Sequence, residues 1–276
     1  MAKGKDANIG IGLGGDKAHN LKILSAASDF LKENNATIHI IGTQSQTHHL
    51  LNDPEYKKND TRISLVKSEE PEEYIIKLLM QGKIDAVVRG SLSSSKFLKS
   101  VKKQMNIDEI NRLTLLETHD GYQFFYGPVG IDECNNLEKK IAFIQSAVKV
   151  LNSLKISPII SVLSGGRKSD IGRDGQVDDT IKIAEEVVRH FQNDKSFSIS
   201  HDEILIEKAI ENKSNLIIAP EGISGNLIYR TLVHLGNGKA HGAIYMDINQ
   251  VIIDTSRVGK ISEIIGAFGL ALALVN

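Results

Sequence analysis

Apolar runs of strand length alternate with longer amphipathic stretches along almost the whole chain, which has 276 residues. This alternation predicts mostly parallel β-sheets, because each crossover helix packs back onto the sheet that its flanking strands build. We therefore predict an α/β fold with helices on both faces of the sheets. The predicted strands are 8–13, 36–42, 62–66, 85–88, 157–163, 215–219, 242–248 and 251–254, and the predicted helices are 17–33, 71–82, 94–104, 178–191, 201–213 and 225–236.

A β-hairpin is predicted at 112–127, where Asp120-Gly121 forms a two-residue turn signal between two strand-like runs. A long amphipathic helix follows near 135–150. No Pro/Ser-rich linker separates the two halves of the chain, so a second domain is entered through this helix. We predict one domain of residues 1–133 with 249–276, and a second of residues 134–248. The apolar stripe of the helix is Leu137, Ile141, Ile144, Val148 and Leu151.

Composition argues against several classes of protein. The formal net charge of −1 argues against a dedicated nucleic-acid binder, which has a basic excess. The single cysteine, Cys134, cannot form an intrachain disulfide, which fits a reducing cytoplasm. The longest apolar stretch, 264–275, is too short to span a bilayer. We expect a cytoplasmic protein with no nucleic-acid or membrane partner, and the lack of H-E-x-x-H and C-x-x-C motifs gives no support for a metal.

Four loops rich in Gly and Ser lie between a predicted strand and the segment before the next helix, at 13–20, 89–96, 164–176 and 220–226. One such loop is typical of an ordinary turn. Four at the carboxyl edge of parallel strands, two of them with basic residues, indicate a phosphate-bearing small molecule, because helix N-termini offer unpaired N–H groups there. The candidate ligand-binding residues are Arg89, Ser91, Ser164, Gly165, Gly166, Arg167, Ser224, Gly225 and Asn226.

The first loop formally matches the dinucleotide motif G-x-G-x-x-G, beginning at Gly10. A dinucleotide site also expects an acidic residue after the second strand, and none follows 36–42. Gly10 and Gly12 also fall inside the predicted strand and not in its turn. The sequence therefore disfavours an NAD site and an ordinary Rossmann-type S-adenosylmethionine site.

Ser256, Arg257 and Glu263 form a candidate catalytic group near the C-terminus. Ser256 is also consistent with a helix cap, and Arg257 with a surface ion pair. Glu263 is harder to explain as a surface residue, because its neighbours are apolar. It follows Ser256 by about two helical turns, so both side chains can face one site. Partial burial raises the pKa of a carboxyl and a nearby Arg lowers it, and this balance tunes a general base.

The segments 215–236 and 252–265 resemble those of the phosphate acetyl/butyryl transferase family. The resemblance implies a phosphotransacetylase fold like that of isocitrate and isopropylmalate dehydrogenases, with a cleft between two domains, and a homodimer. It implies a transferase that moves an acyl group between phosphate and coenzyme A or a related thiol. Ser256 and Arg257 would stabilise the oxyanion and bind phosphate, and Glu263 would deprotonate the thiol. The loops at 164–173 and 220–226 would hold phosphate and cofactor.

Three features depart from that family pattern. Glu221 and Glu263 each stand where the family has Asp, and 124–133 lacks the family's Asp and Asn. The stretch "GPVGIDE" (127–133) resembles instead a divergent branch in methanogens, the methanogenesis marker proteins, which are labelled methyltransferase-related. Two alternatives follow: a methanogenesis-associated methyltransferase-related protein, or a non-catalytic ligand-binding protein on the same fold.

Overall fold

The computed structural model describes residues 4–257 and 259–275, and the chain divides into two compact units. Unit 1 comprises Met1–Ile110 and Ala240–Asn276, and unit 2 comprises Asn111–Lys239. These boundaries differ from the 133/134 and 248/249 boundaries expected from the sequence. The hairpin belongs to unit 2 because its second strand pairs with a strand of that unit, as described below.

Unit 1 is built on the strand order β3-β2-β1-β4-β11-β10. The first five of these strands are parallel, and only β10 runs antiparallel to its neighbour β11. The carboxyl ends of β1, β4 and β11 therefore meet at one edge of the sheet. The strands are β1 (Asn8–Gly12), β2 (Thr37–Gly42), β3 (Ile63–Lys67), β4 (Ala86–Val88), β10 (Lys239–Tyr245) and β11 (Val251–Asp254).

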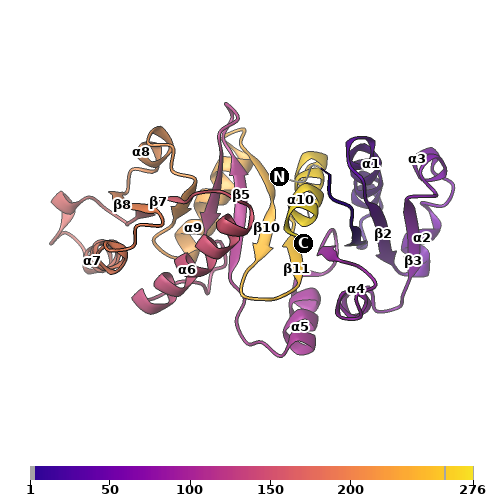
Figure 1. The fold of residues 1–276 in the computed structure, drawn as a ribbon, viewed down its shortest axis with the longest axis horizontal. Helices are drawn as coiled ribbons and strands as arrows, with labels where there is room; N and C mark the ends of the chain where they lie inside the picture. The colour runs from indigo at the N-terminus through magenta and orange to yellow at the C-terminus, as the bar shows by residue number, and fades with distance from the viewer. Residues whose placement is uncertain (1–3, 258, 276) are drawn as a thin grey trace. The chain divides into compact units, whose positions relative to one another are not determined.

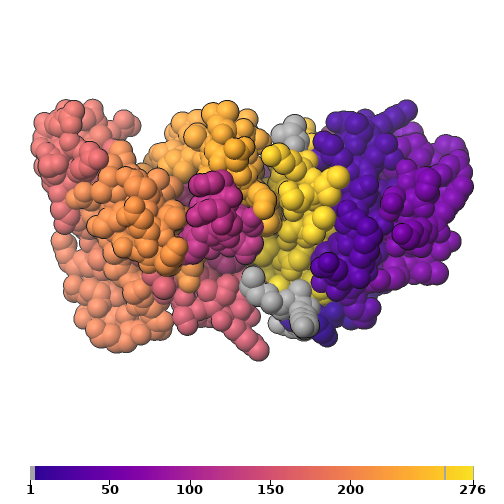
Figure 2. Space-filling model, turned by 90° about the horizontal axis from the view of Figure 1, so that it is seen from above, coloured from indigo at the N-terminus to yellow at the C-terminus, as the bar shows by residue number. Residues whose placement is uncertain are grey.

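Helices cover both faces of the unit 1 sheet. Helices α1 (Lys17–Glu33) and α10 (Ile261–Leu274) pack together, and the centroids of the Phe30 and Phe268 rings are 5.3 Å apart. They lie side by side in both views (Figures 1 and 2), α1 in indigo and α10 in yellow. Helices α4 (Pro71–Met80) and α5 (Ser94–Met105) share a separate buried cluster with strand residues such as Val87. The short helices α2 (Gln44–His48) and α3 (Pro54–Lys58) complete the unit.

Unit 2 is built on the strand order β5-β6-β9-β7-β8. Strand β6 (Gln123–Gly127) pairs antiparallel with β5 (Arg112–Glu117) and parallel with β9 (Leu216–Ile218). The predicted hairpin is thus present and joins the sheet of unit 2. The other elements are β7 (Ile159–Leu163), β8 (Ser198–Glu203), α6 (Leu137–Ser153), α7 (Gly175–Phe191), α8 (Ile206–Glu211), α9 (Gly222–His234) and the 3₁₀ turn η1 (Lys168–Asp170).

The predicted α/β fold with mostly parallel sheets is confirmed, whereas the helix predicted at 201–213 is wrong. Its first residues belong to β8, which pairs parallel with β7 from Ser198 onward, and only α8 is helical. Pairing of His201 and Glu203 with β7 keeps the first three residues of the predicted helix in a strand. Within the described ranges, no helix combines the length and apolar character that crossing a bilayer requires.

Candidate functional site

The candidate site of unit 1 lies where β1, β4 and β11 end, and consists of the loops at 13–16, 89–93 and 255–257 with the first turn of α10. These three strands are parallel neighbours, so their carboxyl ends bring the three loops together. The loops come from parts of the chain that are far apart in sequence. Two buried polar networks hold them in place.

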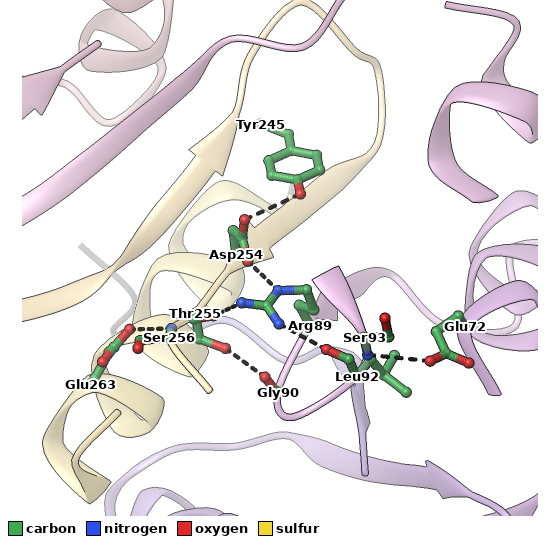
Figure 3. Close-up of polar contacts among 10 residues, drawn as sticks. All are labelled: Glu72, Arg89, Gly90, Leu92, Ser93, Tyr245, Asp254, Thr255, Ser256 and Glu263. Carbon is green, nitrogen blue, oxygen red and sulfur yellow. Dashed lines mark hydrogen bonds and ion pairs between the residues drawn. The ribbon is translucent and has the colours of Figure 1, made fainter. Parts of the chain in front are cut away.

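The first network is centred on Arg89, which is buried directly after β4. Its guanidinium forms an ion pair with Asp254 and donates to the carbonyls of Leu92 (2.8 Å) and Thr255 (Figure 3). The hydroxyl of Tyr245 donates to the second oxygen of Asp254 at 3.2 Å. Arg89 thus fixes the loop after β4 against the loop after β11. Each guanidinium nitrogen already binds a protein acceptor, so the predicted role of Arg89 in phosphate binding stays a prediction.

The second network is centred on Asn20, in the first part of α1. Its side chain accepts from the N–H of Gly14 (3.2 Å) and donates to the Gly14 carbonyl (2.9 Å). The Ser91 hydroxyl donates to the same amide oxygen at 2.9 Å. A Cβ on Gly14 would lie 2.2 Å from the Ser91 carbonyl oxygen, so glycine is required for this close approach of two loops. Ser91 bonds within this network, and its predicted role in phosphate binding stays a prediction.

The glycines of the apparent dinucleotide motif have a packing role. Gly10 and Gly12 lie inside β1, as the sequence indicated. A Cβ on Gly12 would overlap Leu92, at 2.2 Å, and a Cβ on Gly10 would lie 2.7 Å from Ile84. The glycines therefore allow β1 to pack closely against Leu92 and Ile84. This packing explains the glycine pattern without a bound dinucleotide.

Ser256 and Glu263 are brought into contact at the start of α10. The Glu263 carboxylate accepts from the backbone N–H of Ser256 at 2.7 Å (Figure 3). Glu263 is 5% exposed, and burial raises its pKa to about 7. The Ser256 N–H and Arg89 lower the pKa and Asp254 raises it further, but the cost of burying the charge is the largest effect. A carboxyl with this pKa can take up and release a proton near neutral pH.

Ser256 itself is half-buried, and Arg257 is exposed at the surface. The structure therefore places two of the three predicted catalytic residues in direct contact. Arg257 lies next to them in sequence with its side chain facing solvent. The catalytic roles of all three residues remain predictions. Glu263 is the one whose burial and raised pKa suit a general base.

In unit 2, the predicted phosphate loop at 164–167 bonds to its own unit. The Ser164 hydroxyl donates to the Gly166 carbonyl and lies 2.8 Å from Nε2 of His201. The Gly165 N–H donates to the Thr180 hydroxyl at 2.8 Å. The Arg167 N–H donates to Asp170 at 2.9 Å, and its side chain is exposed.

The start of α9 holds the other predicted phosphate loop, and Glu221 caps it. Its carboxylate accepts from the N–H groups of Ile223 (2.6 Å) and Ser224 (3.0 Å), and its carbonyl accepts from Gly225 (2.9 Å). Burial alone would raise the pKa of Glu221, but these hydrogen bonds and Lys140 lower it overall. The Asn226 amide donates to the Val129 carbonyl at 2.9 Å. The phosphate-binding role of Ser224, Gly225 and Asn226 stays a prediction, and their contacts weigh against it.

Residues 58–272 match the phosphate acetyl/butaryl transferase family. The chain belongs to this family. A Methanosarcina mazei protein named "Putative methyltransferase mtx subunit X" is 43% identical over 205 residues, which cover 74% of this chain and 72% of that protein. A phosphate butyryltransferase of Clostridium acetobutylicum is 21% identical over 260 residues, covering 84% of this chain and 78% of that protein.

The fold agrees with that of solved transferases. A branched-chain phosphotransacylase from Enterococcus faecalis superposes with a TM-score of 0.73 at 16% identity, over 97% of this chain and 100% of that chain. The family membership and the fold implied by the resemblance are both confirmed. Among family members, the methanogen relative is much closer in sequence than the butyryltransferase.

Several residues that shape this family member's loops were missed by sequence reasoning. Asn20 and Asp254 hold the unit 1 loops in place. The sequence signals that could have identified them are a polar residue close to a glycine-rich loop, for Asn20, and a polar residue at the end of a strand, for Asp254. Lys140 is 1% exposed in α6 and donates to the Pro220 carbonyl, and burial lowers its pKa to about 8. Cys134 is also buried, which raises its pKa to about 12 and keeps the thiol protonated.

Proposed function

We propose that this chain is a transferase in which Glu263 is the general base for an acceptor thiol. The observation that supports it is the buried carboxyl of Glu263, held on the Ser256 N–H with a pKa raised to about 7. An ordinary thiol has a pKa of about 8.5. Glu263 accepts the thiol proton, the sulfur forms a bond to the carbon of the transferred group, and the bond from that carbon to its donor breaks.

We propose a methyl group as the group transferred. The name of the Methanosarcina mazei relative supports this choice. The contacts of Ser256 and Arg257 also support it, because displacement at a methyl carbon develops no carbonyl oxyanion. The Ser256 N–H is already bound by Glu263, and the Arg257 side chain faces solvent. The Ser256 N–H is therefore not available as an oxyanion donor.

Acyl transfer between phosphate and coenzyme A, or a related thiol, is the second candidate. The family match over residues 58–272 favours it. In this reaction Glu263 has the same role towards the thiol. The Ser256 hydroxyl and Arg257 then stabilise the oxyanion that forms at the carbonyl carbon, where each donor contributes substantially to catalysis.

The two candidates are separated by assays on the full chain. One assay supplies small thiols with isotopically labelled methyl donors from methanogen extract, and the other supplies acetyl-coenzyme A with inorganic phosphate. In whichever assay the wild-type protein is active, the Glu263→Gln substitution is expected to lower the turnover rate about 10²- to 10⁴-fold. Glu69→Gln, a change at an exposed carboxylate of the same unit, is the matched control and should leave the rate unchanged.

Label in the thiol product supports methyl transfer, and acetyl phosphate supports the acyl reaction. An active protein whose Glu263→Gln variant keeps the wild-type rate would contradict the role of Glu263. A protein that binds ligands but is inactive in both assays would point to the non-catalytic alternative.

A further inference from the structure

Unit 2 contains a pocket of about 780 Å³ between the loop at 131–135, helix α7 and the start of α9. This volume is within the range of small-molecule sites. Part of the pocket lining is apolar. It includes Ile131 and Ile223, which are 73% and 59% exposed to solvent. Gly165 and Ser224, from the two predicted phosphate loops of unit 2, also line it. The pocket is thus the place in unit 2 where the phosphate groups of coenzyme A would bind according to the family resemblance.

The charges around this pocket do not fit phosphate groups. Its lining contains five carboxylates and a single lysine, Lys182: the acids are Glu133, Asp174, Asp179, Glu186 and Glu221. A like charge at about 4 Å costs about 1 kcal/mol in bulk water and several times more near a protein surface. Glu133 is ion-paired with Arg112 at 2.9 Å, but the other four acids still outnumber the one exposed lysine for a ligand that carries a pyrophosphate and a further phosphate.

Two of the three basic residues of the neighbouring loop are already paired, and the third, Arg167, is exposed and outside the pocket lining. Lys168 forms an ion pair with Glu185 at 2.8 Å, and Arg173 forms one with Asp170 at 2.7 Å. Beneath the pocket, the buried ammonium of Lys140 donates to the Pro220 carbonyl and is 1% exposed, so it cannot contact a ligand directly.

The backbone donors at the starts of α7 and α9 are also occupied by carboxylates of unit 2. Asp174 caps α7 by accepting from Gln176 (2.9 Å) and Val177 (3.1 Å), and Glu221 caps α9 in the same way. A helix N-terminus attracts anions through these N–H groups. At the start of both helices, a carboxylate of the protein itself accepts from these N–H groups, so they are not available to a bound anion. By contrast, α5 and α10 of unit 1 begin without a side-chain cap.

We infer that unit 2 selects against polyanionic carriers such as coenzyme A, and that the carrier admitted to this pocket is neutral or positively charged where it meets α7 and α9. This inference concerns the thiol carrier of the proposed transferase. It is tested by binding and not by turnover, so its failure is distinguishable from failure of the proposed reaction.

The experiment measures binding of two probes to the full chain by calorimetry: coenzyme A, and pantetheine, which carries the same thiol arm without phosphates. The test variant is Asp179→Asn with Glu186→Gln, two changes on α7 that leave both helix caps intact. We expect the variant to bind coenzyme A at least tenfold more tightly than wild type, with pantetheine affinity unchanged. Adding salt should strengthen coenzyme A binding to wild type, because it screens the repulsion.

Glu211→Gln is the matched control, since Glu211 is an exposed carboxylate of unit 2 outside the pocket lining. It should leave both affinities unchanged. The inference is overturned if the double variant binds coenzyme A no better than wild type. It is also overturned if wild type binds coenzyme A more tightly than pantetheine and loses that preference as salt is added.

Discussion

The carboxylate of Glu263 accepts a hydrogen bond from the backbone N–H of Ser256 at 2.7 Å, across seven positions of sequence and the junction between β11 and α10. This contact holds an acid of raised pKa at the end of the parallel strands of unit 1. Because the raised pKa arises mainly from burial in the folded chain, it links protonation of Glu263 to stability as well as to catalysis.

The contribution of Glu263 to the free energy of unfolding should fall as pH rises from about 4.5 to about 7. In this window folded Glu263 keeps its proton, with a pKa of about 7, while the unfolded chain, with a pKa of 4.5, has released it. The difference amounts to at most about 3 kcal/mol. Urea unfolding at pH 5 and pH 8 measures it. Glu263→Gln should be less sensitive to pH by that amount, and equal pH dependence in both proteins would contradict the buried, raised-pKa carboxyl.

Breaking the Arg89–Asp254 pair should destabilise unit 1 strongly. Arg89→Met or Asp254→Asn leaves a buried charge without its partner, which costs about 3–5 kcal/mol. The matched control is the pair of Lys103 and Glu73, at 3.4 Å, whose side chains are 69% and 48% exposed. Removing Lys103 should cost under about 1 kcal/mol. Urea unfolding measures both, and equal losses would argue against a structural role for Arg89.

Substitution by alanine should destabilise the protein at Gly14 but have little effect at Gly15. A Cβ on Gly14 would lie 2.2 Å from the Ser91 carbonyl oxygen, whereas a Cβ on Gly15 would meet nothing within 4 Å. Gly14→Ala should therefore cost on the order of 1–3 kcal/mol through overpacking. Gly15→Ala should leave stability within about 1 kcal/mol of wild type. Thermal unfolding compares them, and a tolerated Gly14→Ala would mean that the two loops can separate.

Glu221→Ala should expose the N-terminus of α9. The change removes the acceptor for Ile223 and Ser224 and should lower stability by about 1 kcal/mol, as loss of a helix cap does. The freed N–H groups should also give the variant a thermal stabilisation by inorganic phosphate that wild type lacks. Glu221→Gln, which keeps a side-chain acceptor, is the control. An equal effect of phosphate on wild type and Glu221→Ala would show that the cap does not block anions.

The homodimer expected from the family resemblance remains a prediction, and α9 offers a variant that tests it. Large apolar side chains are exposed on or beside this helix, with Leu227 62% and Leu235 80% exposed. If this surface contacts a second copy, Leu227→Lys should convert a dimer to a monomer. Light scattering after size exclusion measures the mass. A monomeric wild-type chain would contradict the expectation, and a dimeric variant would place the contact elsewhere.

Local sequence was sufficient for elements that end in strong local signals. Helix α1 begins after Asp16, which accepts from the N–H groups of Ala18 and His19, and it covers the predicted 17–33 range. The hairpin formed around Asp120-Gly121, but its turn is longer than the two residues predicted, because the Thr118 N–H donates to the Tyr122 carbonyl with three residues between them. Strand β8 was missed because its residues, "SISHDE", are polar, and their strand state depends on pairing with β7.

For the site, the sequence was informative about which loops matter but not about which groups their polar atoms bind. Glu221 was noted as a departure from the family pattern, yet only the fold shows that it caps α9. In α6, the predicted stripe omitted Lys140, which the structure buries beside Phe143 and Ala147. A lysine on that face is tolerated because the Pro220 carbonyl, 80 residues later, accepts from it. Contacts across such separations cannot be read from spacing alone.

The position of Asp254 has a consequence for biosynthesis. Arg89 and Asp254 are 165 residues apart, and β11 completes the unit 1 sheet only after all of unit 2 has been translated. At roughly 5–20 residues per second, the ribosome needs about 10–30 s to supply the partner of Arg89. During that interval β4 has an unpaired edge and a guanidinium without its counter-ion, while unit 2 can already fold. Nascent unit 1 is therefore the part of this protein that is expected to depend on chaperones.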